Sequence, residues 1–188
     1  MRIIAGQFKS RPLKPVAGYD VRPTSDRLRE ALFNVLTAGN PEALSGRVFL
    51  DIFAGTGAVG IEAISRGAGK VYFLESSAKA VAVIRANVKS LRITEGFDVI
   101  DRDALRGLRQ LDAVGVRADY VFLDPPYAEE QAYADTLKFL AHSKLVAPET
   151  LVIAEHEKHF DPGDQVGPLS RTRLLRQGDA TLSLYKSS

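Results

Sequence analysis

The sequence contains no cysteine, no apolar run long enough to cross a membrane and no apolar leader segment at its start. The absence of cysteine excludes disulfides, thiolate metal sites and cysteine nucleophiles together. The first residues, from Met1 to Gln7, lack the apolar core of a signal peptide, and a membrane-spanning helix needs about 20 apolar residues. These absences lead us to expect a cytoplasmic protein without a membrane partner.

Length and charge distribution narrow the class further. The 188 residues are enough for one domain with a small appendage and a full hydrophobic core. Residues 1–30 hold seven basic against three acidic residues, and residues 169–188 hold four against one, so the middle of the chain is acidic. Basic ends around an acidic body suggest a polyanion held beside a catalytic core, although two solvated charged faces explain the same pattern.

Strand and helix patterns alternate along most of the chain. Helices are expected after Thr24 or Ser25 and over residues 57–66, 78–91, 104–111 and 132–141; strands are expected over residues 48–53, 71–74, 97–100, 120–123 and 151–154. This order implies a parallel sheet covered by helices on both faces. Residues 173–176 and 181–185 predict an antiparallel hairpin, so the expected α/β fold has a mostly parallel seven-stranded sheet.

The beginning of the chain has a different pattern. Residues 2–16 alternate apolar and basic residues, which predicts a short hairpin or arm. Pro12 and Pro15 exclude a central strand there, because proline cannot donate to a strand ladder. We therefore expect a basic arm over residues 1–20 and a single domain over residues 21–188.

Acidic residues accompany four consecutive predicted strands. They are Asp51 inside the first strand, Glu75 after the second, Asp101 or Asp103 after the third, and Asp124 after the fourth. Ligands of open α/β sheets bind at the carboxyl ends of the strands. The sequence therefore predicts the functional site at this rim.

The turn after the first predicted strand contains Gly55, Gly57 and Gly60 in the spacing G-x-G-x-x-G. Such glycines permit a tight turn and close approach of a ligand to the backbone, and Glu75 can accept the hydroxyl protons of an adenosine ribose. Asp51 would repel a pyrophosphate and attract an ammonium or sulfonium group. We expect an adenosine-type cofactor, while a purely structural role of the glycines and of Asp51 remains the simpler alternative.

The fourth predicted strand is followed by Asp124, Pro125, Pro126 and Tyr127. The two prolines donate no backbone hydrogen bond, so nearby carbonyls can point into a cleft. The carboxylate of Asp124 and the carbonyl of Pro125 could accept both hydrogens of an exocyclic base amine, and Tyr127 could stack on a base turned out of its helix. The alternative reading is a rigid loop.

These motifs resemble those of class I amino-methyltransferases that act on adenine N6, cytosine N4 or guanine N2. Two segments narrow the choice among these families. They are Arg22-Pro-Thr-Ser-Asp-Arg-Leu-Arg-Glu-Ala-Leu-Phe-Asn34 and Leu50-Asp-Ile-Phe-Ala-Gly-Thr-Gly-Ala-Val-Gly-Ile-Glu-Ala-Ile-Ser-Arg-Gly-Ala68. Together they are similar to the RsmD-like family of bacterial small-subunit ribosomal RNA guanine-N2 methyltransferases, over nearly the whole chain. The resemblance implies a Rossmann-like class I fold and methylation of the N2 amine of a guanine in 16S ribosomal RNA.

Carried over residue by residue, the resemblance implies S-adenosylmethionine as the cofactor. The residues implied to hold it are Arg22, Thr24, Asp51, Phe53, Ala54, Gly55, Thr56, Gly57, Glu75, Ser76, Asp103 and Ala104. Those implied to orient the target amine and base are Asp124, Pro125, Pro126 and Tyr127, and those implied to contact RNA phosphates are Arg2, Lys9, Arg11, Arg27 and Arg29. The RNA is expected free or within an assembled or partly assembled small subunit, and the protein is expected to be a monomer.

Other functions remain open at this point. A nicotinamide-dependent Rossmann oxidoreductase would use the glycines and Glu75 but not Asp51 or the Asp-Pro-Pro-Tyr segment. A DNA adenine-N6 methyltransferase and a non-catalytic RNA-binding or assembly factor are further alternatives. His156 and His159 are too few for a metal site and predict a solvated loop, while His142 predicts a helix-end surface residue. No metal is expected.

Overall fold

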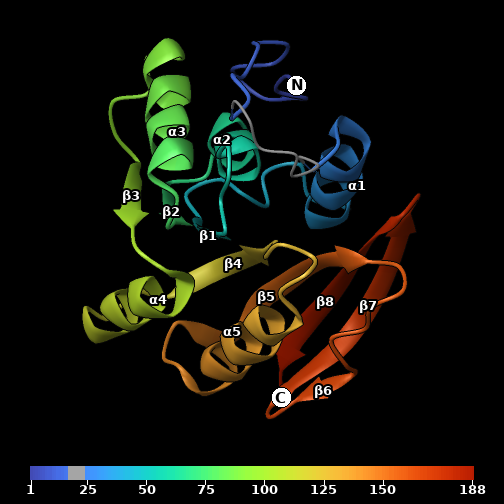
Figure 1. Ribbon diagram of the computed structural model, residues 1–188. Helices are drawn as coiled ribbons and strands as arrows, with labels where there is room; N and C mark the ends of the chain where they lie inside the picture. Colours follow the sequence, from blue (N-terminus) through green and yellow to red (C-terminus); the bar gives the residue numbers. More distant parts are fainter. Residues whose placement is uncertain (17–23) are drawn as a thin grey trace.

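The computed structural model describes residues 1–16 and 24–188. Its elements in chain order are α1 (Asp26–Leu36), β1 (Val48–Ile52), α2 (Ala58–Ser65), β2 (Lys70–Glu75), α3 (Ala78–Ser90), β3 (Phe97–Asp101), α4 (Ala104–Ala113), β4 (Ala118–Leu123), α5 (Glu130–His142), β5 (Val146–Glu157), β6 (Gln165–Val166), β7 (Leu169–Gln177) and β8 (Ala180–Ser187), as Figure 1 shows. The predicted alternation of strands and helices is confirmed.

One sheet runs through the whole molecule in the strand order β3-β2-β1-β4-β5-β8-β7-β6. The strands from β1 to β5 pair in parallel, and β6, β7 and β8 pair antiparallel. The chain builds outward from β1 in one direction through β2 and β3, and in the other through β4 and β5. This reversal between β1 and β4 opens a crevice at their carboxyl ends, where α/β proteins bind ligands.

The helices cover the two faces of the sheet unequally. Apolar residues of α1, α2 and α3 pack in one core cluster, and those of α4 and α5 pack in a second cluster against the opposite face. Figure 1 shows these two groups above and below the sheet. Among the described residues, none of the helices combines the length and apolarity that crossing a lipid bilayer requires.

The antiparallel end of the sheet is larger than the sequence predicts. The sheet has eight strands instead of seven because a two-residue strand, β6, pairs with β7 through Gln165 opposite Ser170 and Val166 opposite Leu169. Leu169 is fully buried in the cluster that holds α5, so this short strand covers a core edge. A two-residue strand carries no periodic pattern, and this is why the sequence does not reveal it.

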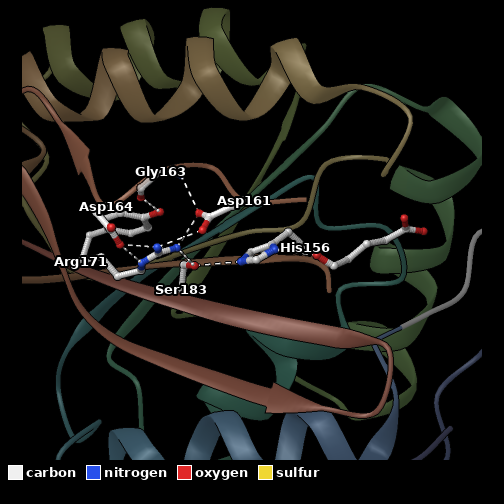
Figure 2. Close-up of polar contacts among 8 residues, drawn as sticks. His156, Asp161, Gly163, Asp164, Arg171 and Ser183 are labelled. Carbon is white, nitrogen blue, oxygen red and sulfur yellow. Dashed lines mark hydrogen bonds and ion pairs between the residues drawn. The ribbon is translucent and has the colours of Figure 1, made fainter. Parts of the chain in front are cut away.

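The expectation of a solvated loop at His156 is wrong, whereas His159 is exposed. His156 lies in β5 and is 2% exposed, because β8 pairs with β5 up to Glu157 and extends the strand. Figure 2 shows the imidazole pointing toward Ser183. His142 is exposed at the last residue of α5, as expected. Among the described residues, no three potential ligands come together in a way that could hold a metal ion.

The contacts of His156 indicate which of its ring nitrogens carries the proton. Its Nδ1 lies 2.8 Å from the Glu157 carbonyl, which only accepts, so Nδ1 carries the proton and Nε2 accepts from the Ser183 hydroxyl at 2.8 Å. Ser183 in turn accepts from Arg171, which also pairs with Asp161 (Figure 2). Burial lowers the pKa of His156, in agreement with a neutral ring in this chain of hydrogen bonds.

The N-terminal arm folds back onto α2. An isolated antiparallel bridge joins Arg2 to Pro12 and forms the expected hairpin. The fully buried carboxylate of Glu62 accepts the backbone N–H groups of Ile4 at 2.8 Å and Ala5 at 3.0 Å. The arm is therefore fixed to α2 by a charged side chain that has no exposure of its own. The expected boundary between residues 20 and 21 lies outside the described residues.

A second anchor connects the arm to α3. The side chain of Asn87 accepts the Lys14 N–H at 2.8 Å and donates to the Lys14 carbonyl at 3.2 Å and the Thr56 carbonyl at 3.0 Å. Gly6 takes a φ of +81° and sits so close to α2 that a Cβ would overlap the Ser65 carbonyl. Only glycine meets both demands, so the arm has a defined path over the helices.

Candidate active site

The turn after β1 is built from residues with left-handed backbone conformations. Phe53, Gly55 and Gly57 have φ values of 62°, 55° and 75°. The Gly57 N–H donates to the Ala54 carbonyl at 2.7 Å and closes the turn immediately before α2. Two of these positions are glycine for that reason, whereas Phe53 holds a strained conformation of a kind that clusters at ligand sites.

Asp51 lies at the base of this turn and is 2% exposed. Its Oδ2 accepts the N–H of Gly60 in α2 at 2.8 Å, and a Cβ at Gly60 would overlap the Phe73 ring. Burial raises the pKa of Asp51 to about 7; the hydrogen bond from Gly60 opposes this rise and the charge of Glu75 adds to it. Asp51 therefore has the structural role of holding the start of α2 through Gly60. A cationic ligand nearby would favour the ionised form of its carboxyl.

Glu75 at the end of β2 connects two turns. Its Oε2 accepts the Gly55 N–H at 2.8 Å and its Oε1 accepts the Ser77 N–H at 2.7 Å. Ser77 caps α3 by accepting the N–H of Ala80. Each carboxylate oxygen keeps a further lone pair, so the fixed Glu75 side chain can still accept two hydroxyl protons from a ribose.

The end of β4 brings Asp124 beside β1 and β5. The Asp124 N–H donates to the Ile52 carbonyl at 3.2 Å and continues the sheet ladder. Ser25 caps α1, and the preceding Thr24 places its hydroxyl 2.9 Å from Glu155 Oε2 and 3.4 Å from Asp124 Oδ2. Asp124 is partly buried, and this burial raises the pKa of its carboxyl well above 3.8; the negative charge of Glu155 raises it further.

The residues that follow Asp124 are held by two tyrosines. The buried Tyr133 of α5 places its hydroxyl 2.8 Å from the Glu155 carbonyl and 3.3 Å from the Pro125 carbonyl. The Tyr127 hydroxyl lies 3.4 Å from Glu155 Oε1. Pro125 is buried and Pro126 is exposed. The loop is therefore fixed to β5 and α5 on its inner side, and its outer side faces the cavities.

Two adjoining pockets collect most of the expected site residues. The first has a volume of about 330 Å³ and is lined by Thr24, Asp51, Phe53, Ala54, Gly55, Thr56, Glu75, Ser76, Asp124 and Pro126, among others. The second, of about 600 Å³, is lined by Asp103, Ala104, Tyr127 and residues of α5. Phe53 and Glu129 belong to both. Gly57 and Pro125 line neither pocket and support the walls, and Arg22 lies outside the described residues.

The basic residues expected to contact RNA do not all reach the surface. Arg2, Lys9, Arg11 and Arg27 are exposed. The expectation is wrong for Arg29, which is fully buried and donates to the Arg2 carbonyl at 2.8 Å and to Asp26. Arg29 fixes the start of the arm to α1, and its side chain is not available to a phosphate.

Several pocket residues are not predicted by the sequence. Met1, Pro15 and Val16 of the arm line the first pocket, as does Glu129. The buried carboxylate of Glu155 lies behind the Asp-Pro-Pro-Tyr loop. Glu155 follows an apolar run in the fifth strand, so extending the rule of acidic strand ends by one strand would have found it. The arm residues carry no such signal, because only the fold brings them to the pocket.

The chain is similar to known proteins over nearly its whole length. A family described as "Conserved hypothetical protein 95" matches residues 1–186. A Bacillus subtilis protein named "Putative rRNA methyltransferase YlbH" is 36% identical over 99% of this chain and 98% of its own length. "Ribosomal RNA small subunit methyltransferase D" of Haemophilus influenzae is 35% identical over 84% of this chain and 79% of its own.

Solved structures of methyltransferases have the same fold as this chain. The structure titled "Putative methyltransferase yhhF from Escherichia coli" superposes with a TM-score of 0.85, at 30% identity, over 100% of this chain and 98% of that one. The structure titled "Crystal structure of SMU.776, a putative methyltransferase complexed with SAH" has a TM-score of 0.66 at 14% identity, covering 85% of this chain and 48% of that one, and therefore supports the fold alone. The class I methyltransferase fold is confirmed, and the chain belongs to the RsmD family of "Conserved hypothetical protein 95".

Proposed function

We propose that this protein transfers a methyl group from S-adenosylmethionine to the exocyclic N2 amine of a guanine in 16S ribosomal RNA, which by family resemblance is guanine-966. The observation that carries the proposal is the lining of one pocket by both Asp51 and Asp124. The first carboxylate suits a cationic cofactor, and the second suits the N–H groups of an acceptor amine.

The residues of the first pocket fit S-adenosylmethionine by their chemistry. The absence of side chains at Gly55 and Gly57 in the turn after β1 allows close approach, and Glu75 offers two carboxylate oxygens for ribose hydroxyls. Asp51 provides negative charge for the ammonium and sulfonium groups and none of the cationic contacts that a pyrophosphate needs. When bound, the cofactor supplies an electrophilic methyl group. The residues of the chain bind the cofactor, orient it toward the acceptor and exclude water from the site.

The acceptor base is held by the loop after β4. The Asp124 carboxylate accepts an amine hydrogen, and its raised pKa makes the ionised form a strong hydrogen-bond acceptor. The Pro125 carbonyl lies 3.3 Å from the Tyr133 hydroxyl, which is closer to the Glu155 carbonyl, so its lone pairs remain for the second amine hydrogen. Tyr127 lines the adjoining pocket, where its ring can stack on the base. Rate enhancement then comes mainly from positioning and electrostatics, and the product nitrogen can lose its extra proton afterwards.

Two lines of support point to ribosomal RNA as the acceptor. The relatives named above carry ribosomal RNA in their names. Exposed basic residues of the arm, including Arg2, belong to the same segment as Met1, which lines the pocket. A basic surface beside a base-binding pocket suits the phosphates that flank a flipped nucleotide.

The test is methyl transfer with defined acceptors. The purified protein is incubated with labelled S-adenosylmethionine and either free 16S RNA or small subunits from a strain that lacks the modification, and the methylated nucleoside is identified by mass spectrometry. We expect N2-methylguanosine. Label on adenine, label in DNA, or binding of NAD in preference to S-adenosylmethionine would contradict the proposal.

A matched pair of variants tests the role of Asp124. Asp124→Asn should lower kcat by at least about 100-fold, because the amide oxygen is a weaker acceptor, while cofactor affinity changes little. Asp98→Asn is the control, since Asp98 is exposed on β3 and pairs with Lys70 away from the pockets. Near-normal turnover of Asp124→Asn would refute the assignment.

A further inference from the structure

Glu155 is a buried carboxylate that the proposed reaction does not use. It is 3% exposed, lies in β5, and lines neither pocket. Its side chain contacts Thr24 and Tyr127, and its backbone carbonyl accepts from Tyr133. We propose that Glu155 is a positioning residue of this active site, which holds Thr24 and Tyr127 so that Asp124 keeps its acceptor oxygens for the base amine. This role rests on the proposed function.

The distances indicate where the Thr24 hydroxyl sends its one hydrogen. Glu155 Oε2 lies 2.9 Å from the Thr24 oxygen, within the normal range, whereas Asp124 Oδ2 lies at 3.4 Å, at its outer limit. A hydroxyl has a single hydrogen to donate. Glu155 therefore takes the hydrogen that Asp124 would otherwise accept, and both oxygens of Asp124 stay available to a substrate.

The same side chain also contacts the aromatic part of the site, but more weakly. The Tyr127 hydroxyl lies 3.4 Å from Glu155 Oε1, at the outer limit of a hydrogen bond. The Tyr133 hydroxyl donates from the α5 side to the Glu155 backbone carbonyl at 2.8 Å and lies 3.3 Å from the Pro125 carbonyl. Glu155 thus connects three chain segments, those of α1, the loop after β4, and α5, through hydrogen bonds of its own atoms.

The charge of Glu155 also acts on Asp124. A like charge nearby disfavours ionisation, so Glu155 raises the Asp124 pKa in addition to the effect of burial. The other groups that face Asp124 are Asp51 from β1, which raises this pKa further, Thr24, whose hydroxyl lowers it, and Tyr133 from α5. Replacing Glu155 by glutamine removes one negative charge from this set and leaves the Thr24 hydroxyl a weaker acceptor, so that more of its hydrogen bonding is directed to Asp124. Both effects lower the Asp124 pKa.

The central experiment compares Glu155→Gln with the unchanged protein in rate, cofactor affinity and pH profile. We expect a folded variant whose S-adenosylmethionine affinity stays within about threefold and whose kcat falls at least about tenfold, since small misplacements of reacting groups are costly. The acidic limb of its kcat/KM profile should move to lower pH. Glu157→Gln is the control, because Glu157 is exposed on the same strand.

A second substitution tests the mechanism directly. Thr24→Val in the Glu155→Gln background removes the hydroxyl that would occupy Asp124, so the double variant should be faster than Glu155→Gln alone. A normal kcat with an unshifted profile in Glu155→Gln would overturn the proposal. Equal losses of kcat and of cofactor affinity would also overturn it, because they would assign Glu155 to the cofactor pocket.

The titration of Asp124 separates this inference from the proposed function. Carbon-13 NMR of labelled aspartate follows Asp124 without any turnover, and its midpoint should fall in Glu155→Gln but not in Glu157→Gln. Failure of the unchanged protein to methylate guanine would refute the proposed function only. An unchanged Asp124 midpoint in Glu155→Gln would refute the role of Glu155, whatever the acceptor proves to be.

Discussion

The buried carboxylate of Glu62 offers a sharp test of how the arm is held. It accepts backbone N–H groups from Ile4 at 2.8 Å and Ala5 at 3.0 Å, and a third bond from Arg66 at 2.8 Å. Glu62→Gln keeps the shape of the side chain but leaves a single acceptor oxygen. The new NH2 group must then face at least one donor that it cannot satisfy.

The expected loss of stability follows from the number of hydrogen bonds that Glu62 accepts. A hydrogen bond to a charged group contributes about 1.5–3 kcal/mol, and a buried donor left unpaired costs about 1–3 kcal/mol. Because the two contributions overlap, we expect Glu62→Gln to lower the free energy of unfolding by about 2–4 kcal/mol. This is a large part of the total of about 5–15 kcal/mol that folded domains have.

Urea denaturation followed by circular dichroism measures the loss. With a slope of about 2 kcal/mol per molar urea, the midpoint should fall by about 1–2 M. Glu149→Gln, on an exposed carboxylate of β5, is the control and should leave the midpoint unchanged. S-adenosylmethionine affinity should fall with Glu62→Gln, because Met1 and Pro15 of the arm line the pocket. A midpoint within about 0.3 M of the unchanged protein would refute the anchoring role.

Two further predictions concern pH. The pKa of Asp51 is raised to about 7, so the affinity for S-adenosylmethionine, measured by calorimetry, should fall as the pH drops below that value. Asp51→Asn should abolish this dependence on pH. An affinity that stays level from pH 8 to pH 5.5 in the unchanged protein would contradict the prediction. The lowered pKa of His156 means that the unfolded chain binds the proton first, so the free energy of unfolding should fall as the pH drops below 6.5. His156→Asn should remove this part of the pH dependence in urea denaturation, and the exposed His159→Asn should retain it.

The site rim could be predicted because local rules act there. Asp51, Glu75 and Asp124 lie at or near the carboxyl ends of strands that their own apolar runs reveal, and a parallel sheet brings such ends to one edge. Gly55 and Gly57 were identifiable because their left-handed φ values are ones that glycine readily adopts. For these residues, neighbours in the sequence determine most of the outcome.

The two wrong expectations, an exposed Arg29 and a solvated loop at His156, have their origin in the tertiary structure. Arg29 has the charge of a surface residue, yet the fold supplies the Arg2 carbonyl and Asp26 as partners and buries it. His156 is buried because β8, far along the chain, extends β5 past the end that the apolar run predicts. The helical period places position 29 on the same face as the buried Leu32, Phe33 and Leu36, but the arm carbonyl that satisfies Arg29 and the strand that covers His156 lie far away in sequence.

The two anchors of the arm have a mechanical consequence. The single amide of Asn87 holds the backbone of Lys14 on one side and the Thr56 carbonyl of the glycine turn on the other. Displacement of the arm would break the two bonds between Asn87 and Lys14 and release the side chain that also supports the Thr56 carbonyl in the wall of the first pocket. One amide thus links the position of the arm to the backbone that lines the pocket.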